Sequence, residues 1–512
     1  MHQSQPTPWN PEKLARAWFV FAVVLTLVWS TLRLADGFQG PHSYVSGHFS
    51  VMAQNFAKEG VVSLRGVPVQ ENTPYGDTIN YYTHWPPLFP IVLGVVFRIF
   101  GATANVALVF VLLLMFANTF LVVATLRRFL SPTAGYFGGM VFLAAPIVMK
   151  YGAFVLHLHL AFFWTLIALY ALADVISDEA KRHRLVPGLV AVVLAQWTSW
   201  EPSLVFAGAL IGAVLWGDQR QRKVAAYFFA ASFLGAVSVV AYYFAVSPAL
   251  RQDLWEVARF RLGLSSTINA ASAVKSPTFA EVLSRYSLYF AQVEQFGFLC
   301  VALLAGYLAA ARRKVGHVGI ACATLGWAAL WLGWSVVLKN HVYFHEYQVW
   351  ISVPACAMAA GVVAHFLAER AETSQDESLR ATLSVAVAVV IPIVILKSLI
   401  GFTAVQLRVD HGDDRLIAFA KEVRDHTEEG SIVVSDALEM VPAFYADRHV
   451  VGSVADTVAA DKAIANARRE YGPVTPIYFA VVAPLGNDAA AALGRRYPLV
   501  YRSEAATIFR AP

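Results

Sequence analysis

Long apolar stretches recur along almost the whole chain, and this repetition most constrains what the chain can fold into. A membrane-crossing helix needs about 20 predominantly apolar residues, and twelve stretches reach or approach that length. They lie at 17–35, 86–101, 104–126, 134–150, 154–174, 186–198, 201–217, 225–246, 291–311, 317–338, 348–368 and 381–404. The pattern predicts an α-helical polytopic membrane protein.

The composition agrees with this prediction and excludes several classes of protein. Hydrophobic residues make up 58% of the chain and charged residues 14%, against about 45–50% and about 25% in soluble domains. A soluble enzyme, a disordered scaffold and a fibrous protein are therefore excluded. The net charge of +5 comes from short Lys/Arg clusters between apolar runs, which is typical of topology signals. The expected partner is a lipid bilayer, with no nucleic acid.

Clusters of positive charge predict which loops face the cytoplasm. The positive-inside rule assigns this side to Lys13/Arg16, Lys181–Arg184, Arg220–Lys223 and Arg312–Lys314. The outer side then receives the polar stretches 36–85, 197–202, 247–290 and 339–347 and the C-terminal tail. Twelve crossings from a cytoplasmic N-terminus cannot end outside, so one crossing between residues 98 and 150 is miscounted. We expect about 12–13 transmembrane helices.

The tail differs in character from the rest of the chain. Charged residues return at Arg408, and short β-rich runs at 431–435 and 477–482 alternate with amphipathic stretches at 413–426 and 459–471. This alternation predicts a small α/β domain. The expected organisation is a transmembrane domain at 1–404, with an outer loop at 36–85, and an extracytoplasmic α/β domain at 405–512.

The outer loop 36–85 contains two recognisable segments. From His48 onward, the apolar residues Phe49, Met52, Ala53 and Phe56 recur at helical spacing, which predicts an amphipathic helix in the membrane interface. The loop then ends with the sequence NYYTHWPPLFP at 80–90. Its consecutive prolines restrict the backbone before the next helix, and its aromatic residues are typical of a membrane interface.

These segments resemble the polyprenyl-phosphate-sugar-dependent glycosyltransferases of the GT-C superfamily. The similarity is to bacterial relatives of protein O-mannosyltransferases and of the lipid A aminoarabinose transferase. It follows the whole chain in order, and His-x-Pro-Pro-Leu is its most specific element. The matching segments are Met52–Phe56 with Gly60, Tyr81–Leu88, Trp200–Pro202, His341–Tyr347 and Tyr445–Arg448.

The resemblance implies an integral membrane glycosyltransferase with a GT-C-like fold in the inner (plasma) membrane. Such an enzyme takes a sugar from a polyprenyl phosphate and transfers it, on the outer face, to an envelope glycan, lipid or protein. The sequence identifies neither the sugar nor the acceptor. No cofactor is indicated with certainty, and a requirement for a divalent metal stays open.

One position departs from the family pattern. Relatives have His-Asp-aromatic where this chain has His42-Ser43-Tyr44, and the resemblance makes that Asp the general base. Serine cannot accept the proton unaided, and general-base catalysis contributes about 10²–10⁴-fold. The neighbouring replacements are Asp36, His42, His48, His84 and Glu201.

We favour Glu201 and His42 among these, because Glu201 is an acid at an outer helix end and His42 adjoins the vacant position. The expected catalytic group is Glu201, His42, Ser43 and His84. The lipid phosphate needs cations or hydrogen-bond donors. The 247–290 loop offers Arg251, Arg259, Arg261, Lys275 and Arg285. The expected substrate-binding group is Tyr81, Tyr82, His48, Lys339, His341, His345, Glu346 and Tyr347.

Structural roles compete with these functional ones. His84 is also suited to a hydrogen bond within the loop, Glu201 to capping the helix that begins at Pro202, and Glu346 to an ion pair with Lys339.

Two other functions of the protein stay open. A non-catalytic relative that binds lipid-linked sugar or scaffolds a complex is supported by Ser43. A transporter is less favoured, because few ionisable residues lie inside the spans and no matched pair of broken helices occurs.

Overall fold

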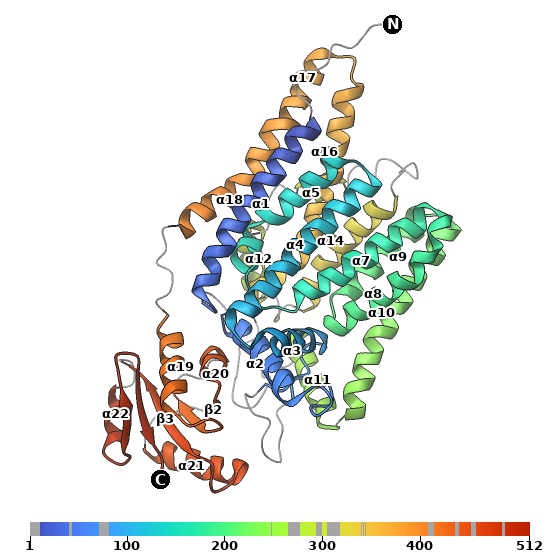
Figure 1. Ribbon diagram of the computed structural model, residues 1–512. Helices are drawn as coiled ribbons and strands as arrows, with labels where there is room; N and C mark the ends of the chain where they lie inside the picture. Colours follow the sequence, from blue (N-terminus) through green and yellow to red (C-terminus); the bar gives the residue numbers. More distant parts are fainter. Residues whose placement is uncertain are drawn as a thin grey trace. The chain divides into compact units, whose positions relative to one another are not determined.

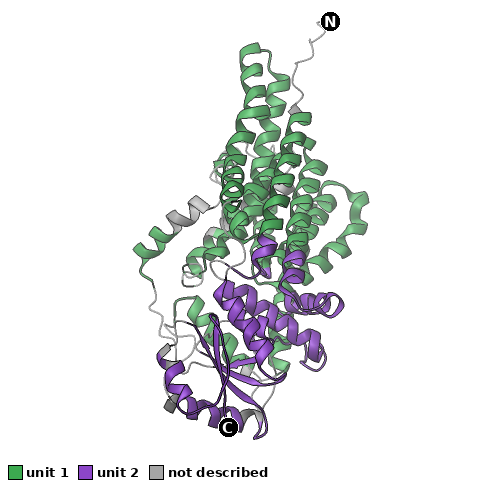
Figure 2. Ribbon diagram, turned by 60° about the vertical axis from the view of Figure 1, so that its left-hand side comes forward, with its two compact units in different colours: residues 1–32, 112–153, 158–409 green, residues 33–111, 154–157, 410–512 purple. Residues whose placement is uncertain are grey.

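The computed structural model describes most of the chain. The described residues are 11–39, 43–70, 81–246, 248–264, 277–292, 299–304, 318–338, 340, 343, 345–407, 414–435, 440–451, 457–483 and 487–512. The chain divides into two compact units (Figure 2). Unit 1 comprises residues 1–32, 112–153 and 158–409, and unit 2 comprises residues 33–111, 154–157 and 410–512.

Unit 1 is helical throughout its described residues (Figure 1). Its long helices include all or most of α1 (Pro11–Asp36), α4 (Ala104–Phe129), α7 (Leu158–Ser177), α10 (Gln219–Val246), α14 (Val318–Val337), α16 (Val353–Thr373) and α18 (Ile391–Gln406). The shorter elements are α5 (Pro132–Ala144), α6 (Pro146–Tyr151), η1 (Glu179–Arg184), α8 (Leu185–Thr198), α9 (Pro202–Trp216), α11 (Pro248–Arg261), α12 (Phe279–Gln292), η2 (Glu346–Ser352), α17 (Glu377–Val385) and the π-helical turn η3 (Ala386–Val390).

The helices confirm the predicted class of a multi-pass membrane protein. Six stretches of helix in the described residues are long and apolar enough to cross a membrane, and three shorter apolar helices accompany them. The six are 12–36, 104–129, 158–177, 219–246, 346–373 and 377–406. The predicted span 291–311 lies largely outside the described residues.

The region where the crossing count is ambiguous contains short helices. The apolar run 134–150 forms two of them, α5 and α6, because Pro146 lacks an amide hydrogen and drives Ala145 into an extended conformation with ψ 125°. The 13 residues of α5 span about 20 Å at 1.5 Å per residue. The hydrocarbon core is about 30 Å thick, so α5 is too short to cross it upright.

Two helix crossings in unit 1 depend on glycine. Gly208 in α9 and Gly326 in α14 face each other so closely that a Cβ on either would collide with the backbone of the other. A Cβ on Gly361 in α16 would likewise meet the carbonyl oxygen of Ala134 in α5. Close backbone approach at small residues is the usual way in which helices associate in lipid, so these glycines fix the bundle around α9 and α14.

Unit 2 contains a five-stranded sheet with the strand order β2-β1-β3-β5-β4. The strands are β1 (Ile432–Ser435), β2 (His449–Val451), β3 (Ile477–Val482), β4 (Leu499–Arg502) and β5 (Ala506–Arg510). The first three strands are parallel, and β5 runs antiparallel to both β3 and β4. The accompanying helices are α19 (Arg415–His426), α20 (Met440–Ala446), α21 (Thr457–Tyr471) and α22 (Asn487–Gly494).

Both faces of this sheet are buried, which explains why its strands are apolar without alternation. Ile432, Val434 and Phe479 pack with residues of α21 and α22 on one face. Val433 and Ala480 pack with residues of α19 and α20 on the other. The predicted small α/β fold of the tail is therefore confirmed.

The outer-loop segment in unit 2 forms the helix α2 (Ser43–Glu59), followed along the chain by α3 (Leu88–Phe100). The predicted helical spacing from His48 is present, and Phe49, Met52, Ala53 and Phe56 are all buried. Helix α2 packs against both α3 and α20. At Gly47 the approach to α20 is so close that a Cβ would meet the backbone of Met440 and Val441.

Candidate functional site

The turn between α8 and α9 buries an acidic side chain. Pro202 begins α9 at a position where a missing amide hydrogen costs nothing, and this sets Glu201 at the end of the turn. Glu201 is only 3% exposed. The hydroxyl of Ser199 donates a hydrogen bond to its Oε2, whereas its Oε1 is buried and has no hydrogen-bond partner among the described residues. The carboxylate makes no capping hydrogen bond to α9.

The surroundings of Glu201 are mostly apolar. It lines a cavity of about 10 Å³, which has room for roughly one water molecule. Burial raises the pKa of Glu201 to about 7, although the Ser199 hydrogen bond, the backbone amides of Glu201 and Trp200 and the charge of Arg261 oppose the shift. The remaining lining residues come from α7, α9, α14 and η2: Leu158, Ala161, Phe162, Thr165, Pro202, Val205, Trp327 and Ile351.

Arg261 is the buried cation of this region. It ends α11 and is 9% exposed, whereas Arg251, Arg259 and Arg285 are exposed. Of the cations expected in the 247–290 loop, Arg261 is the one whose charge lowers the pKa of Glu201. Lys275 lies outside the described residues. A carboxyl that titrates near neutral pH beside a guanidinium is suited to accepting a proton and to stabilising negative charge.

A second polar cluster in unit 1 forms around Glu346 at the start of η2. Its Oε1 accepts hydrogen bonds from Nζ of Lys150 and from the hydroxyl of Tyr151, both in α6. The Lys150 bond is also an ion pair, so Glu346 pairs with Lys150, and Lys339 lies outside the described residues. Helix η2 ends beside the Glu201 cavity, which Ile351 lines. There the Trp327 indole donates to the Ile351 carbonyl at 2.6 Å.

Aromatic rings adjoin the Glu346 cluster. The ring of Tyr347 lies 6.2 Å from that of Tyr151 and 5.2 Å from that of His345. The expected residues His345, Glu346 and Tyr347 are thus together in space, and the expected His341 lies outside the described residues. Sequence reasoning missed Lys150 and Tyr151. The available signal was Lys150 itself, an isolated cation at the end of an apolar run.

In unit 2, the rings of three expected residues, His48, Tyr82 and His84, lie in a row. The ring centroids of His48 and Tyr82 lie 4.7 Å apart, and those of Tyr82 and His84 also lie 4.7 Å apart. Burial lowers the pKa of His48 to about 4, and its Nε2 is buried with no hydrogen-bond partner among the described residues. His48 is therefore neutral at pH 7 and a weak base.

Backbone contacts hold the segment that carries Tyr82, the middle residue of this row. Tyr81 forms an isolated bridge with Val69, and the Tyr82 amide donates to the Pro68 carbonyl at 2.8 Å. The side-chain amide of Asn55 in α2 donates to the Val69 carbonyl at 3.1 Å. The Asn55 contact explains why the first loop motif has an asparagine at this position.

The position that departs from the family pattern lies at the start of α2. Ser43 is the first residue of α2 and is half-buried, and His42 lies outside the described residues. Asp36, the other nearby acid, is buried and pairs with Arg33 at 2.8 Å. Among the proposed replacements, Glu201 is a carboxyl whose pKa burial raises to about 7.

The motif Tyr445–Arg448 joins the tail to the first loop within unit 2. The hydroxyl of Tyr445 accepts a hydrogen bond from the Phe38 amide at 3.1 Å. Oδ1 of Asp447 accepts from Nε2 of Gln54 at 2.9 Å and from Nζ of Lys58.

The last residue of this motif, Arg448, is buried and turns back into the tail. It donates to the carbonyls of Arg424 and Thr427 at 3.0 and 2.8 Å. These contacts give Asp447 and Arg448 structural roles.

The described residues contain no group of three His, Cys, Asp or Glu side chains arranged to hold a metal ion. The rings of His157 and His159 pack against different partners, Trp85 and Trp350 respectively.

Comparison with known proteins identifies similar folds. No family model and no curated protein matches the sequence. ArnT from Cupriavidus metallidurans, in a structure bound to undecaprenyl phosphate, is similar with a TM-score of 0.64 and 16% identity, over 96% of this chain and 98% of that chain. The archaeal oligosaccharyltransferase AglB from Archaeoglobus fulgidus, in complex with an inhibitory peptide and a dolichol-phosphate, is similar with a TM-score of 0.57 and 14% identity, over 93% and 71%.

The mycobacterial arabinofuranosyltransferase AftD gives a TM-score of 0.50 and 14% identity, over 96% of this chain and 40% of that chain. Its similarity therefore concerns less than half of AftD. All three are GT-C proteins. The chain thus shares the fold of these proteins, and the resemblance predicted from the loop motifs is confirmed at the level of the fold.

Proposed function

We propose that this chain is an integral membrane glycosyltransferase that moves a sugar from a polyprenyl-phosphate donor to a cell-envelope acceptor. The observation that carries the proposal is the shared fold over 96% of the chain with ArnT, whose structure holds undecaprenyl phosphate. AglB, with a dolichol-phosphate, adds a second lipid phosphate on the same fold. The acceptor class stays an envelope glycan, lipid or protein.

In the proposed reaction, an acceptor hydroxyl attacks the anomeric carbon of the donor sugar. The new bond joins the acceptor oxygen to that carbon, the bond from the carbon to the phosphate oxygen breaks, and the polyprenyl phosphate leaves with the bonding electrons. The acceptor proton must go to a base. We assign this role to Glu201, because its pKa near 7 is well suited to general-base catalysis at neutral pH.

Two features of the Glu201 turn support this assignment. Its Oε1 has no hydrogen-bond partner among the described residues, whereas the Ser199 hydroxyl donates to Oε2. The adjoining cavity of about 10 Å³ has room for a single water that could relay the proton. Arg261 is the nearby guanidinium that we assign to the phosphate of the leaving group, because arginine binds phosphate oxygens with paired hydrogen bonds.

The test is a transfer assay with purified protein, membrane extract and a panel of radiolabelled polyprenyl-phosphate sugars. Wild type should transfer label from at least one donor to an extractable acceptor. The variant Ser43→Asp, which restores the family's acid, should transfer at least as fast. Absence of transfer from every donor by both proteins would contradict the proposal.

A second candidate function is a non-catalytic protein that binds lipid-linked sugar, and Ser43 is the observation that favours it. Such a protein would bind a labelled donor without forming a glycosylated product. Transfer that appears only in Ser43→Asp would support this candidate and remove Glu201 from the mechanism.

We also propose the topology in which this reaction occurs. The transmembrane domain would comprise residues 1–404 of a plasma membrane protein, with residues 405–512 on the extracytoplasmic side. A single cysteine placed at exposed Glu429, in a variant without the three native cysteines, should react with a membrane-impermeant maleimide in intact cells. Labelling only after the membrane is permeabilised would overturn this assignment.

A further inference from the structure

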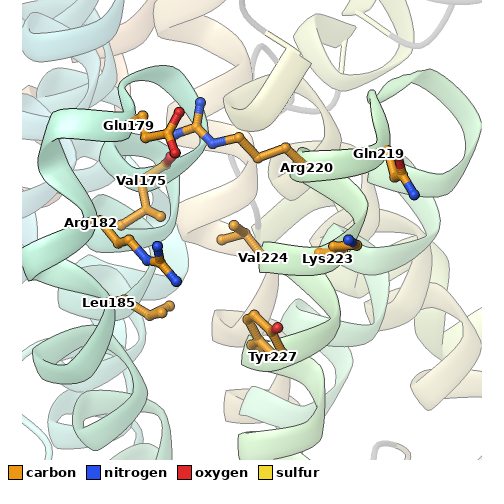
Figure 3. Close-up of a pocket in the computed structure, with 9 residues that line it drawn as sticks. All are labelled: Val175, Glu179, Arg182, Leu185, Gln219, Arg220, Lys223, Val224 and Tyr227. Carbon is orange, nitrogen blue, oxygen red and sulfur yellow. The ribbon is translucent and has the colours of Figure 1, made fainter.

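A basic pocket lies in unit 1, and none of the motifs that resemble the family lines it. The cluster Lys181–Arg184 forms most of η1, and the cluster Arg220–Lys223 lies in the first turn of α10. These elements enclose a pocket of about 380 Å³ (Figure 3). This volume lies within the range of about 300–1,000 Å³ that is usual for small-ligand sites.

The pocket is lined by three cations and one acid. Arg182 comes from η1, Arg220 and Lys223 come from α10, and Glu179 is the acid. Figure 3 shows the Arg220 side chain reaching from α10 toward Glu179 and Val175, and its Nη2 donates to the Val175 carbonyl at 2.7 Å. Because the pocket has more cations than acids, it favours an anionic ligand.

Two of the three cations have all their side-chain hydrogen-bond donors available for a ligand. Both Arg182 and Lys223 are exposed, and neither side chain has a hydrogen bond or ion pair among the described residues. The neighbouring Arg184, by contrast, is paired with Asp174. The first turn of α10 is itself already capped, because the Gln221 amide donates to Asp218 at 2.8 Å. An anion in the pocket would therefore be bound by the side chains of Arg182 and Lys223.

The same pocket has an apolar side, and the helices that form this side carry further exposed apolar residues. Val175, Leu185 and Val224 line it together with Tyr227. Further along α8, Val186 and Val190 are exposed, and so are Tyr227 and Leu234 along α10. Exposed apolar side chains on membrane-spanning helices face lipid. A ligand that fits both sides carries a phosphate group beside an acyl chain.

We propose that this pocket binds the phosphodiester headgroup of an anionic membrane phospholipid. Arg182 provides a planar fork for two phosphate oxygens, and Lys223 provides a point charge. The positive-inside rule predicts that both basic clusters lie on the cytoplasmic side, where basic pockets between helices bind anionic headgroups. The site is independent of sugar transfer, so its test needs no donor or acceptor.

The test measures binding of three probes to the purified full-length protein in a neutral detergent. The probes are dioctanoyl phosphatidylglycerol, dioctanoyl phosphatidylcholine and inorganic phosphate. The test variant is Arg182→Gln/Lys223→Gln, which alters two exposed side chains. The control variant is Arg16→Gln/Lys181→Gln, which removes two charges from the same predicted side but outside the pocket.

Wild type and the control variant should bind phosphatidylglycerol saturably and more tightly than phosphatidylcholine. The test variant should bind it about tenfold to thirtyfold more weakly, since each basic residue near anionic lipid contributes on the order of one tenfold step or slightly less. Equal affinities in the test and control variants would overturn the proposal. Displacement of the lipid by an equal concentration of inorganic phosphate would also overturn it, and would identify a free phosphate site.

Discussion

Glu201 and Asp447 are both acids in motifs that resemble those of glycosyltransferases, and their surroundings are opposite. Asp447 is 35% exposed in its side chain, and its Oδ1 accepts hydrogen bonds from Gln54 and Lys58. Glu201 is buried in apolar surroundings, and its Oε1 has no partner among the described residues. A partly exposed carboxylate that accepts from a neighbouring helix holds elements together, whereas a buried carboxylate with an unpartnered oxygen is a candidate for chemistry.

Glu346 is intermediate between these two. It is only 18% exposed in its side chain, but Lys150 and Tyr151 both donate to it. Its role should therefore be closer to that of Asp447 than to that of Glu201. Substitution should therefore affect turnover at Glu201, stability at Glu346, and neither strongly at Asp447.

The largest expected effect is on turnover. Glu201→Gln should reduce kcat for sugar transfer by about 10²–10⁴-fold, because an amide cannot accept the proton. This loss corresponds to roughly 3–5 kcal/mol of activation free energy. Donor binding, measured separately, should change little. The matched control is Glu377→Gln, at an exposed position in α17, and equal kcat values in the two variants would exclude Glu201 from the mechanism.

The second effect is on stability. Glu346→Gln removes the ion pair to Lys150 and weakens the bond to Tyr151, so the free energy of unfolding should fall by about 1–2 kcal/mol. Thermal unfolding in detergent measures it. In a double-mutant cycle with Lys150→Gln, the two changes should be less than additive. Full additivity would mean that the Lys150 pair contributes nothing.

The third effect concerns the junction of the tail and the first loop. Tyr445→Phe removes the acceptor of the Phe38 amide, which should cost about 1 kcal/mol because a half-buried N–H loses its partner. Hydrogen exchange at the Phe38 amide should accelerate accordingly. Tyr501→Phe, also in the tail, is the control, and unchanged exchange in Tyr445→Phe would show that this bond does not form.

The smallest effect should come from Asp447→Asn. Its ion pair with Lys58 is exposed, with 39% and 35% side-chain exposure, and such pairs contribute little. Asn also tolerates the positive φ of 52° at this position. The free energy of unfolding should change by less than about 0.5 kcal/mol. A loss as large as that of Glu346→Gln would break the proposed order of the three acids.

Elements with a repeating pattern could be predicted from the sequence. The apolar runs located helices such as α4 and α10, and the spacing from His48 located α2, because burial in lipid or protein imposes a period on the residues. The strands β1 and β3 were likewise evident as short continuous apolar runs. The break at Ala145 had a local cause in Pro146, which the hydropathy of the run 134–150 concealed.

Pairings across long sequence distances could not be predicted. Lys150 and Glu346 are 196 residues apart, and no periodicity links them. Arg261 was one of several equivalent cations in its loop, and only burial distinguishes it. The roles assigned to Glu201, His84, Tyr81 and Tyr82 stay predictions, as do those of His42, Lys339 and His341.

The most direct test of the central claim is the pH dependence of kcat for sugar transfer in wild type and in Ser199→Ala. If Glu201 is the base, the rate should rise as pH increases through about 7, where its carboxyl loses its proton. Loss of the Ser199 hydrogen bond removes an interaction that favours the carboxylate, so the rising limb should move to higher pH. A limb that stays at the same pH in Ser199→Ala would contradict the assignment of Glu201.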